Sequence, residues 1–538
     1  MTIQHWVNLP FSEATIKVGS GATPTGGKES YHESGIPLIR SQNVRFEGFM
    51  EDGLVFLDAA QAASLDNAIV CCNDVLLNIT GASIGRVTLA PSHLDGARVN
   101  QHVTIIRLKK GINPSFVRWF FASPGQQRKI NSIQVGVTRQ ALTKEMILRF
   151  ELPLPSLREQ ERIVAKIEEL FSDLDAGVAA LKRAKANLKR YRAAVLKAAV
   201  EGKLTEEWRS KHPAKEPASK ILERILKERR QKWEADQIAK FATAKKEPPK
   251  NWREKYVEPS PPVKTGLPEL PNDWCWASVD QICDVGTGTT PSRTNAGFYE
   301  NGLIPWIMSG AANHPFVDEA SEFVTELALQ ETTLRLYPKG TLILALYGEG
   351  KTRGMVSELR IEATVNQALG ALVFSDSAIF VQPFLKVFLM SNYVQLRRQA
   401  AGGMQPNLNL GIVKQIVMPL PPISEQAPIV AEVASRISQI DVAETSIEHD
   451  LLRADRLRQS ILKQAFEGKL VPQDLQDESA SVLLERLKVE AASRRLPTDE
   501  QSKRQDAAST KRTRGKMEEA NGSPRTRSCR MSKTPLEE

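Results

Sequence analysis

Two long stretches of this chain are close copies of each other. LPLPSLREQERIVAKIEELFSDLD spans residues 152–175, and MPLPPISEQAPIVAEVASRISQID spans residues 418–441. The same shift of 266 positions places VLKAAVEGKL (195–204) on ILKQAFEGKL (461–470), and 19 of the 53 aligned positions are identical. The chain is therefore a duplication, and the repeat is too long for the stacked units of a solenoid.

Each copy contains the pattern of a long helix. Apolar residues recur at alternating steps of three and four, and this 3.5-residue period is typical of a coiled-coil seam. Two such helices in one chain most economically pack on each other, so we expect an antiparallel pair that acts as a ruler. The seam residues are Val164, Ile167, Phe171, Leu174, Val178, Leu181 and Leu188 in the first copy, and Val430, Val433, Ile437, Ile440, Ile447, Leu451 and Ile461 in the second.

Polar residues interrupt both seams. Arg192 and Arg458 occupy matching seam positions, and Lys185 and Glu444 are further interruptions. Two interpretations stay open: the side chains extend to solvent from a loosened seam, or they fix the register, as single polar seam residues can.

The region before each helix has a different character. Short β-rich runs such as Val75–Ile79, Val103–Leu108 and Thr341–Leu346 are punctuated by Gly and Pro, and one helix is expected near Ser115–Ala122. The expected fold class is α+β, with two similar mixed α/β domains joined by two long antiparallel coiled-coil helices in a pseudo-two-fold internal repeat. The expected divisions are 1–151 (first globular domain), 152–204 (first long helix), 205–265 (central connecting region with a short helix and a Pro-rich linker), 266–417 (second globular domain), 418–470 (second long helix), 471–490 (short distal helix) and 491–538 (basic tail of disorder-like composition).

Composition excludes several classes of protein. With 538 residues, 41% hydrophobic and 25% charged, and a mean hydropathy of −0.30, the chain is neither collagen-like nor wholly disordered. The longest apolar run, 341–347, is far shorter than the ~20 residues that cross a bilayer. No signal peptide is apparent at the start, and the five cysteines form no C-x-x-C pair, so a cytoplasmic location without disulfides is expected.

The net charge of +9 is unevenly distributed. The stretch 205–258 carries 15 basic and 10 acidic residues, and 491–538 carries 12 and 7, whereas 266–417 carries 10 and 14. Charge alone therefore does not identify a DNA-binding protein.

Three motifs suggest catalysis, but each has a structural explanation. Ala345-x4-Gly350-Lys351-Thr352 is a relaxed P-loop pattern, but a strand-like stretch follows it where a P-loop requires a helix. Asn113-Pro-Ser-Phe116 resembles the Asn-Pro-Pro-aromatic motif of amino-methyltransferases without its second proline. None of the seven histidines has metal-ligand or triad spacing, so we expect no catalytic residues, no metal site and no cofactor site on this chain.

The combination of repeats resembles one family, the specificity (S) subunit of type I restriction–modification enzymes. The resemblance rests on the two helix-opening segments and on EGKL, which closes both helices. It also rests on LPELPNDWCWASVDQI (267–282), KLTEEW (203–208) and ILERILKERRQKWEA (221–235), which look like the family's second-domain entry and its central conserved region.

This resemblance implies two target-recognition domains that each read one half of a bipartite double-stranded DNA sequence, with the paired helices setting the distance between the halves. It implies two modification (methyltransferase) subunits and restriction (motor/nuclease) subunits as partners, with S-adenosylmethionine, ATP and Mg²⁺ used on those partners. Two other classes stay open: a coiled-coil adaptor without DNA specificity, and a self-contained methyltransferase or nuclease.

Candidate DNA-contact residues are cationic, amide, hydroxyl or aromatic side chains in loops, because phosphate contacts position a protein while base contacts specify. In the first domain they are Arg40, Ser41, Gln42, Asn43, Asn78, Thr80, Arg86, Thr138 and Arg139; in the second they are Ser309, Asn313, His314, Tyr347, Lys351, Arg353, Gln405 and Asn407. Asn100-Gln101 and Asn366-Gln367 occur in both copies and are assigned to scaffold hydrogen bonds. The Glu-Gln pairs that open both helices (Glu159, Gln160, Glu425, Gln426) are candidates for subunit docking.

Overall fold

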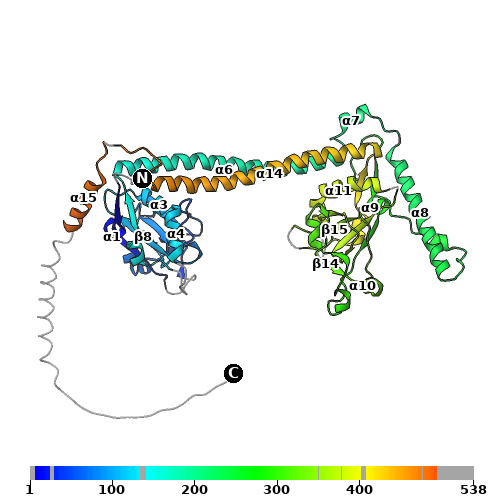
Figure 1. Cartoon of the computed structure of the whole chain (residues 1–538), viewed down its shortest axis with the longest axis horizontal. Coiled ribbons are helices and arrows are strands. Elements are labelled where there is room, and N and C mark those ends of the chain that lie inside the picture. The colour runs from blue at the N-terminus through cyan, green and yellow to red at the C-terminus, as the bar shows by residue number, and fades with distance from the viewer. Residues whose placement is uncertain are drawn as a thin grey trace, which may run out of the picture. The chain divides into compact units, whose positions relative to one another are not determined.

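The computed structural model describes residues 6–24, 30–133, 141–263, 265–348, 351–376, 378–401, 407–474 and 476–493. These residues form two compact units (Figure 1). Unit 1 comprises the chain up to Val178 together with the part from Leu451 onward, and unit 2 comprises residues 179–450. Each unit contains one mixed α/β domain, here called a head, so the expected α+β fold class is confirmed.

Both predicted long helices are present. Helix α6 spans Leu157–Val200 and helix α14 spans Ile423–Phe466, each with 44 residues and so about 66 Å long at ~1.5 Å per residue. Because the division between the units falls at Val178 and Leu451, inside both helices, each helix contributes to both units. No helix in the described parts of the chain is long and apolar enough to cross a membrane.

The first head is built from two main sheets and a small strand pair. The four-stranded sheet has the order β2-β8-β5-β6, the three-stranded sheet has the order β4-β3-β7, and β1 pairs with β9. The strands are β1 Val7–Pro10, β2 Thr15–Ser20, β3 Ile36–Ile39, β4 Val55–Leu57, β5 Val75–Asn78, β6 Val87–Leu89, β7 Arg98–Val99, β8 Val103–Leu108 and β9 Glu151–Leu154; the helices are α1 Phe11–Ala14, α2 Ala59–Ala63, α3 Pro114–Ala122, α4 Pro124–Ile133 and α5 Lys144–Leu148.

The second head repeats this strand order. Its sheets are β11-β18-β15-β16-β13 and β14-β12-β17, with β10 paired to β19, so β13 is an addition at one edge. The strands are β10 Cys275–Ser278, β11 Asp284–Thr287, β12 Ile304–Ile307, β13 Phe316–Val317, β14 Glu322–Val324, β15 Leu342–Ala345, β16 Val356–Leu359, β17 Thr364–Val365, β18 Leu369–Val373 and β19 Val417–Leu420; the helices are α9 Val279–Ile282, α10 Glu326–Glu331, α11 Gln382–Ser391, α12 Tyr393–Ala401 and α13 Leu410–Lys414. The internal repeat thus extends to topology.

Each head shares its hydrophobic core with the long helices. In unit 1, Phe116 and Phe121 of α3 pack in one cluster with Ile167 of α6 and Leu462 of α14. In unit 2 the corresponding cluster joins Phe384 of the head to residues of both helices, among them Val195 and Ile429. The head and the helix ends of each unit therefore fold as one body.

The segments that follow the long helices complete the heads. After α6 come α7 (Glu206–Lys211) and α8 (Ala218–Thr243), and the ASKILERI segment that opens α8 buries Ile221 in the core of unit 2. After α14 comes α15 (Ala480–Ser493), and its related ASVLLERL segment buries Leu483 in the core of unit 1. The sequence echo between the two segments thus reflects equivalent packing.

Candidate nucleic-acid interface

In the first head, three loops meet beside the end of β5. The side-chain amide of Asn78, the last residue of β5, donates to the backbone oxygen of Ser41 at 2.8 Å. Thr80 follows and is hydrogen-bonded to Nδ1 of His102 at 2.6 Å. Leu142 donates its backbone N–H to the Ile79 carbonyl at 2.9 Å, so the segment before α5 joins the cluster.

The candidate residues of this head differ in exposure. Gln42 is exposed, and Arg40, Ser41, Thr80 and Arg86 are partly exposed, so all five can meet a ligand. In contrast, Asn43 and Asn78 have no exposed surface. The Asn43 amide donates to the Met50 carbonyl at 2.8 Å. These two buried asparagines shape the loops through their hydrogen bonds, and their role as base contacts stays a prediction.

The second head brings its own candidates together in the same way. Asn313, at the end of the turn 309–313, donates its side-chain amide to Oγ1 of Thr352 at 3.2 Å. Leu408 donates its backbone N–H to the Leu346 carbonyl at 3.1 Å, which places Asn407 beside the start of the loop that contains Tyr347. The exposed candidates of this head are Asn313, His314, Tyr347 and Lys351, and the partly exposed ones are Ser309, Arg353 and Asn407.

The clusters have equivalent positions but different residues. Arg40-Ser-Gln-Asn43 follows β3, whereas Met308-Ser-Gly-Ala311 follows β12. The loop between β5 and β6 covers residues 79–86, and its counterpart between β15 and β16 is longer, at 346–355. Thr138, Arg139 and Gln405 lie outside the described residues, so their roles stay predictions.

The duplicated Asn-Gln pairs have scaffold contacts. Asn100 Oδ1 accepts the backbone N–H of His102 at 3.0 Å, and Asn366 Oδ1 accepts that of Ala368 at 3.1 Å. The adjacent glutamines accept hydrogen bonds from threonine hydroxyls, Thr23 to Gln101 and Thr290 to Gln367. Equivalent internal hydrogen bonds in both heads agree with a structural role for these pairs.

The Glu-Gln pairs at the helix starts are buried. Glu159, Gln160, Glu425 and Gln426 are 4%, 0%, 2% and 3% exposed. Trp6 donates its indole N–H to Glu159 at 2.9 Å, and Trp274 does the same to Glu425 at 2.8 Å. These residues hold each head to the first turn of a long helix, and their docking of another subunit stays a prediction.

Each of these helix starts has a different set of supporting charges. In unit 2, Glu425 also accepts from the Thr205 hydroxyl at 2.6 Å and from Arg209 Nε at 3.0 Å. In unit 1, Arg162 pairs with Asp477 at 2.7 Å. That hydrogen bond, helped by one from the Ser156 hydroxyl, holds the pKa of Asp477 below its ordinary value. Sequence reasoning missed these partners because they are far from the glutamates along the chain.

The polar seam residues form ion pairs across the two long helices. In unit 2, Arg192 pairs with Asp441 and with Glu444, the latter at 3.1 Å, and Lys185 pairs with Glu448 at 2.6 Å. In unit 1, Arg458 pairs with Asp175 and lies over the ring of Phe171. These ion pairs show that the two helices are antiparallel in unit 2. From Lys185 to Arg192 the residue numbers rise along α6, while those of the paired residues fall along α14.

The two arginine pairs are equivalent under the 266-residue shift, which relates Arg192 to Arg458 and Asp175 to Asp441. Equivalent pairs in both units favour the interpretation that these arginines fix the register. They favour it over the alternative, in which the side chains only extend to solvent.

The two sequence motifs that suggest catalysis have structural explanations in the part of the chain that the structure describes. The segment after Lys351 leads into strand β16 and not into a helix. The Asn113 side chain accepts from the backbone N–H groups of Ser115 and Phe116 and so caps α3, with Pro114 at its first position. Among the described residues, no group of three or more His, Cys, Asp or Glu side chains could hold a metal ion.

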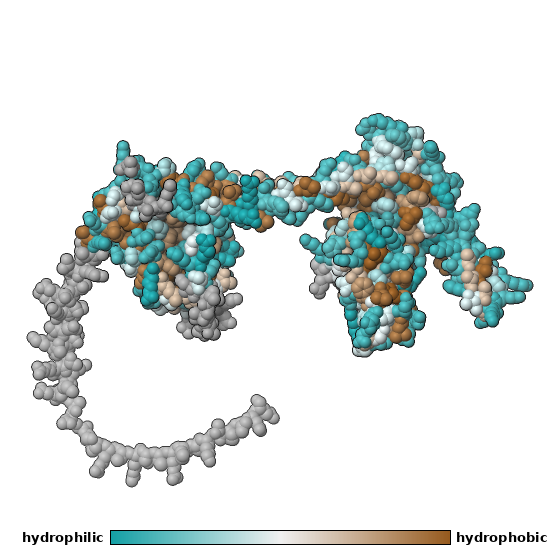
Figure 2. Space-filling view, viewed as in Figure 1, coloured by the Kyte–Doolittle hydropathy of each residue, from teal (hydrophilic) through white to brown (hydrophobic). Residues whose placement is uncertain are grey.

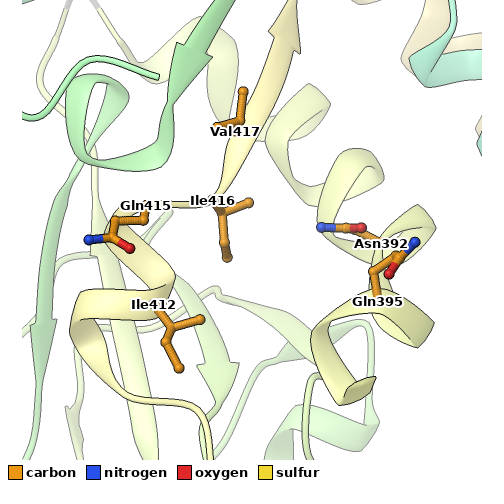
Figure 3. A pocket seen from close by; sticks show the side chains of 6 residues that line it. All are labelled: Asn392, Gln395, Ile412, Gln415, Ile416 and Val417. Carbon is orange, nitrogen blue, oxygen red and sulfur yellow. The ribbon is translucent and has the colours of Figure 1, made fainter. Parts of the chain in front are cut away.

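An open pocket in unit 2 offers amides but no charged group. Its volume is about 640 Å³, and Figure 3 shows Asn392 and Gln395 on one side, with Gln415 on the other. Ile412, Ile416 and Val417 complete the lining. Since none of these side chains is an acid, a base or a nucleophile, the pocket has no catalytic group of its own.

Comparison with known proteins gives a consistent result. The family described as "Type I restriction modification DNA specificity domain" matches residues 58–184 and 271–452. The type I restriction enzyme EcoKI specificity subunit of Escherichia coli (strain K12) is 25% identical over 515 residues, covering 91% of this chain and 96% of that protein. The EcoDI specificity subunit of Escherichia coli is 27% identical over 394 residues, covering 71% and 77%.

A solved structure has the same fold. That structure is described as the basis of complex assembly and conformational transition of the type I R-M system. The similarity has a TM-score of 0.61 at 17% identity, over 86% of this chain and 98% of that one.

Proposed function

This chain belongs to the type I restriction modification DNA specificity family, and from that premise we propose that each head reads one half of a bipartite duplex target. One observation carries the proposal: both heads have the same strand order and the same three-loop cluster, but the residues of the clusters differ. A duplicated scaffold with divergent loops suits a molecule that reads two different short sequences on one duplex.

The exposed groups of the clusters suit DNA. Amides such as those of Gln42 and Asn313 can pair with adenine, and a guanidinium such as that of Arg40 can pair with guanine. Lys351 and Arg86 suit phosphates, which position a protein without specifying the sequence. Both kinds of contact are available in each unit.

We also propose that α6 and α14 set the length of the unspecified spacer between the half-sites. Each helix runs without a break from one unit into the other. A helix of fixed length, with its register held by the arginine pairs, is a suitable spacer element.

The chemistry is assigned to partner subunits. We propose that two modification subunits carry S-adenosylmethionine-dependent adenine methylation, and that restriction subunits carry ATP- and Mg²⁺-dependent motor and nuclease activity. In this assignment the chain acts in the cytoplasm, without a catalytic site or cofactor of its own. The exposed outer faces of α6 and α14 are then surfaces available for docking.

Methylation mapping tests the proposal. The chain is co-expressed with its modification subunits, and methylated adenines are located by sequencing. We expect a bipartite motif, relaxed in one half only by Gln42→Ala and in the other half only by Asn313→Ala. Relaxation of the same half by both variants, or a motif without two halves, would contradict it.

A further inference from the structure

The connecting region of unit 2 forms an arm, defined here as residues 226–258, that the proposed DNA reading does not use. Helix α8 extends beyond its contacts with the core and ends at Thr243. Lys245 then adopts a left-handed backbone angle (φ +50°), and the chain returns along the helix. Figure 1 shows α8 on the same side of α14 as the head of this unit.

The arm is held together by aromatic residues. Trp233 of α8 stacks on Trp252 of the returning segment, with ring centroids 5.9 Å apart, and lies 5.3 Å from the ring of Tyr256. Phe241 meets Trp252 edge to face at 6.2 Å. Trp252 is buried as a result. The arm is therefore an ordered element with a small core of its own, and not a loose linker.

The arm is also fixed to the head at its base. Arg229 donates to the backbone oxygen of Asp280, and the Asp280 carboxylate accepts the backbone N–H of Ser260 at 3.2 Å. The Ser278 hydroxyl donates to the Ser260 carbonyl at 2.7 Å. Both ends of the arm are thus tied to α9 and β10, so its position relative to the head of unit 2 is defined.

Positive charge gathers on this arm. From Lys227 to Glu258 there are ten lysine or arginine residues and six aspartate or glutamate residues, a net charge of +4. The ion pairs in the described arm involve Arg230 and Arg253. Several lysines are exposed and have no carboxylate partner among the residues that the structure describes: Lys227, Lys232, Lys240, Lys245, Lys246, Lys250 and Lys255. Figure 2 shows a largely hydrophilic surface here.

We propose that the arm binds the phosphate backbone of duplex DNA without reading its sequence, an inference that rests on the proposed function. Residues 266–417, which include the second head, carry 10 basic and 14 acidic residues, so this head supplies little phosphate attraction itself. Lysines suit this task because they are point charges on flexible stems. The arm adds the affinity that the acidic head lacks.

A polyanion fits the arm better than a protein partner does. Protein interfaces are usually anchored by aromatic residues packed in the partner's pockets. The arm uses its aromatic residues internally, since Trp252 is buried and Trp233 and Tyr256 are partly buried. Lysine is the commonest charged residue on the surface that remains, which also exposes acidic residues and the apolar side chains of Ile238 and Val257.

The test measures how affinity for DNA depends on salt. The complex with modification subunits is titrated with a target duplex and with an unrelated duplex at several salt concentrations. The variant replaces Lys240, Lys245, Lys246 and Lys250 by glutamine. A matched control removes four positive charges by the same substitution at Lys110, Lys203, Lys211 and Lys339, which are also exposed and lie outside the arm, the loop clusters and the two long helices.

For the arm variant we expect the slope of log affinity against log salt to fall in magnitude by about 2 to 4, because each lost phosphate contact contributes about 0.9. Both duplexes should be affected alike, so the ratio of specific to unrelated binding is unchanged. The control should keep the wild-type slope. Circular dichroism checks that the variant is folded.

The outcomes separate the two proposals. If the wild-type complex does not prefer any duplex, the proposed function fails. The arm inference fails if the wild type prefers its target but the arm variant has the wild-type slope of log affinity against log salt. It also fails if the slope falls in magnitude by the same amount in the arm variant and in the control. An arm variant with normal salt dependence that no longer assembles with the modification subunits would instead assign the arm to a protein partner.

Discussion

A tryptophan indole donates to a buried glutamate at the start of each long helix. The pairs are Trp6 with Glu159 and Trp274 with Glu425, and they join residues more than 150 positions apart in sequence. A buried carboxylate is stable only when hydrogen-bonded or paired, because burial removes its water. Each indole therefore helps to stabilise a buried carboxylate at a helix start.

We predict that Trp6→Phe lowers the free energy of unfolding by about 1–3 kcal/mol, because it removes one donor from a buried acceptor while keeping an aromatic ring against Phe116. Urea unfolding measures the change. The control is Trp208→Phe, whose ring is partly exposed like that of Trp6 but stacks on the exposed His212 and has no carboxylate partner among the described residues, so it should cost less. Equal losses in the two variants would show that the hydrogen bond to Glu159 is unimportant.

A second residue-scale prediction concerns Lys351, which is exposed in the loop cluster of the second head. Lys351→Ala should weaken DNA binding and reduce the salt slope by about 0.9, the contribution of one phosphate contact. Lys339→Ala, which removes an exposed lysine elsewhere in the same head, is the control. An ATPase activity of the purified chain that disappears in Lys351→Ala would instead revive the P-loop interpretation.

Single residues were the least predictable level. Residue type correctly placed several exposed polar groups in the loops, but it could not separate exposed Gln42 from buried Asn43 one position away. Likewise, Glu159 and Glu425 have the sequence appearance of surface charges. Their indole partners, Trp6 and Trp274, immediately precede strands β1 and β10, far away in sequence, and only the folded chain brings them together.

At the scale of elements, the most informative contacts are the ion pairs between α6 and α14. Several seam residues near the middle of the helices, including Leu174, Val178, Leu181 and Leu188, are only partly buried. An apolar seam that is not fully buried distinguishes weakly between registers. The pairs of Arg192 and Arg458 supply that distinction.

A double-mutant cycle on Arg192→Ala and Asp441→Ala should give a coupling energy of about 0.5–1 kcal/mol, measured by chemical unfolding. The matched cycle combines Arg192→Ala with Glu432→Ala, which pairs with Arg436 and not with Arg192. In that control, the effects of the two substitutions on the free energy of unfolding should be additive. If the two cycles gave the same coupling, the arginines would be solvated side chains without influence on register.

Elements were predicted well where periodicity was strong. The coiled-coil repeat indicated both long helices, and the β-branched run at Val103–Leu108 is strand β8 with those bounds. Asn113 and Pro114 mark the start of α3 as capping rules require. The short helix expected in the connecting region is present as α8, but the fold of the arm was missed, because its aromatic core joins Trp233 to Trp252 across a turn that no local pattern identifies.

At the scale of the whole molecule, duplication explains most of the organisation. The shared strand order of the heads, the equivalent arginine pairs and the related segments of α8 and α15 all follow from one repeated unit. The two copies then diverged where their surfaces differ, in the loop clusters and in the added arm and strand β13. The central claim is that the repeated heads read separate half-sites at a distance set by the long helices.

The most direct test inserts one heptad into α6 after Val178 and one into α14 before Leu451, at the division between the units, so that each unit stays intact. Seven residues lengthen a helix by about 10.5 Å, which corresponds to about three base pairs at ~3.4 Å each. An insertion in one helix alone is the control and should impair assembly, because it breaks the register. Methylation mapping of the doubly inserted protein should show a spacer longer by about three base pairs between unchanged half-sites; an unaltered spacer in a folded, active complex would contradict the claim.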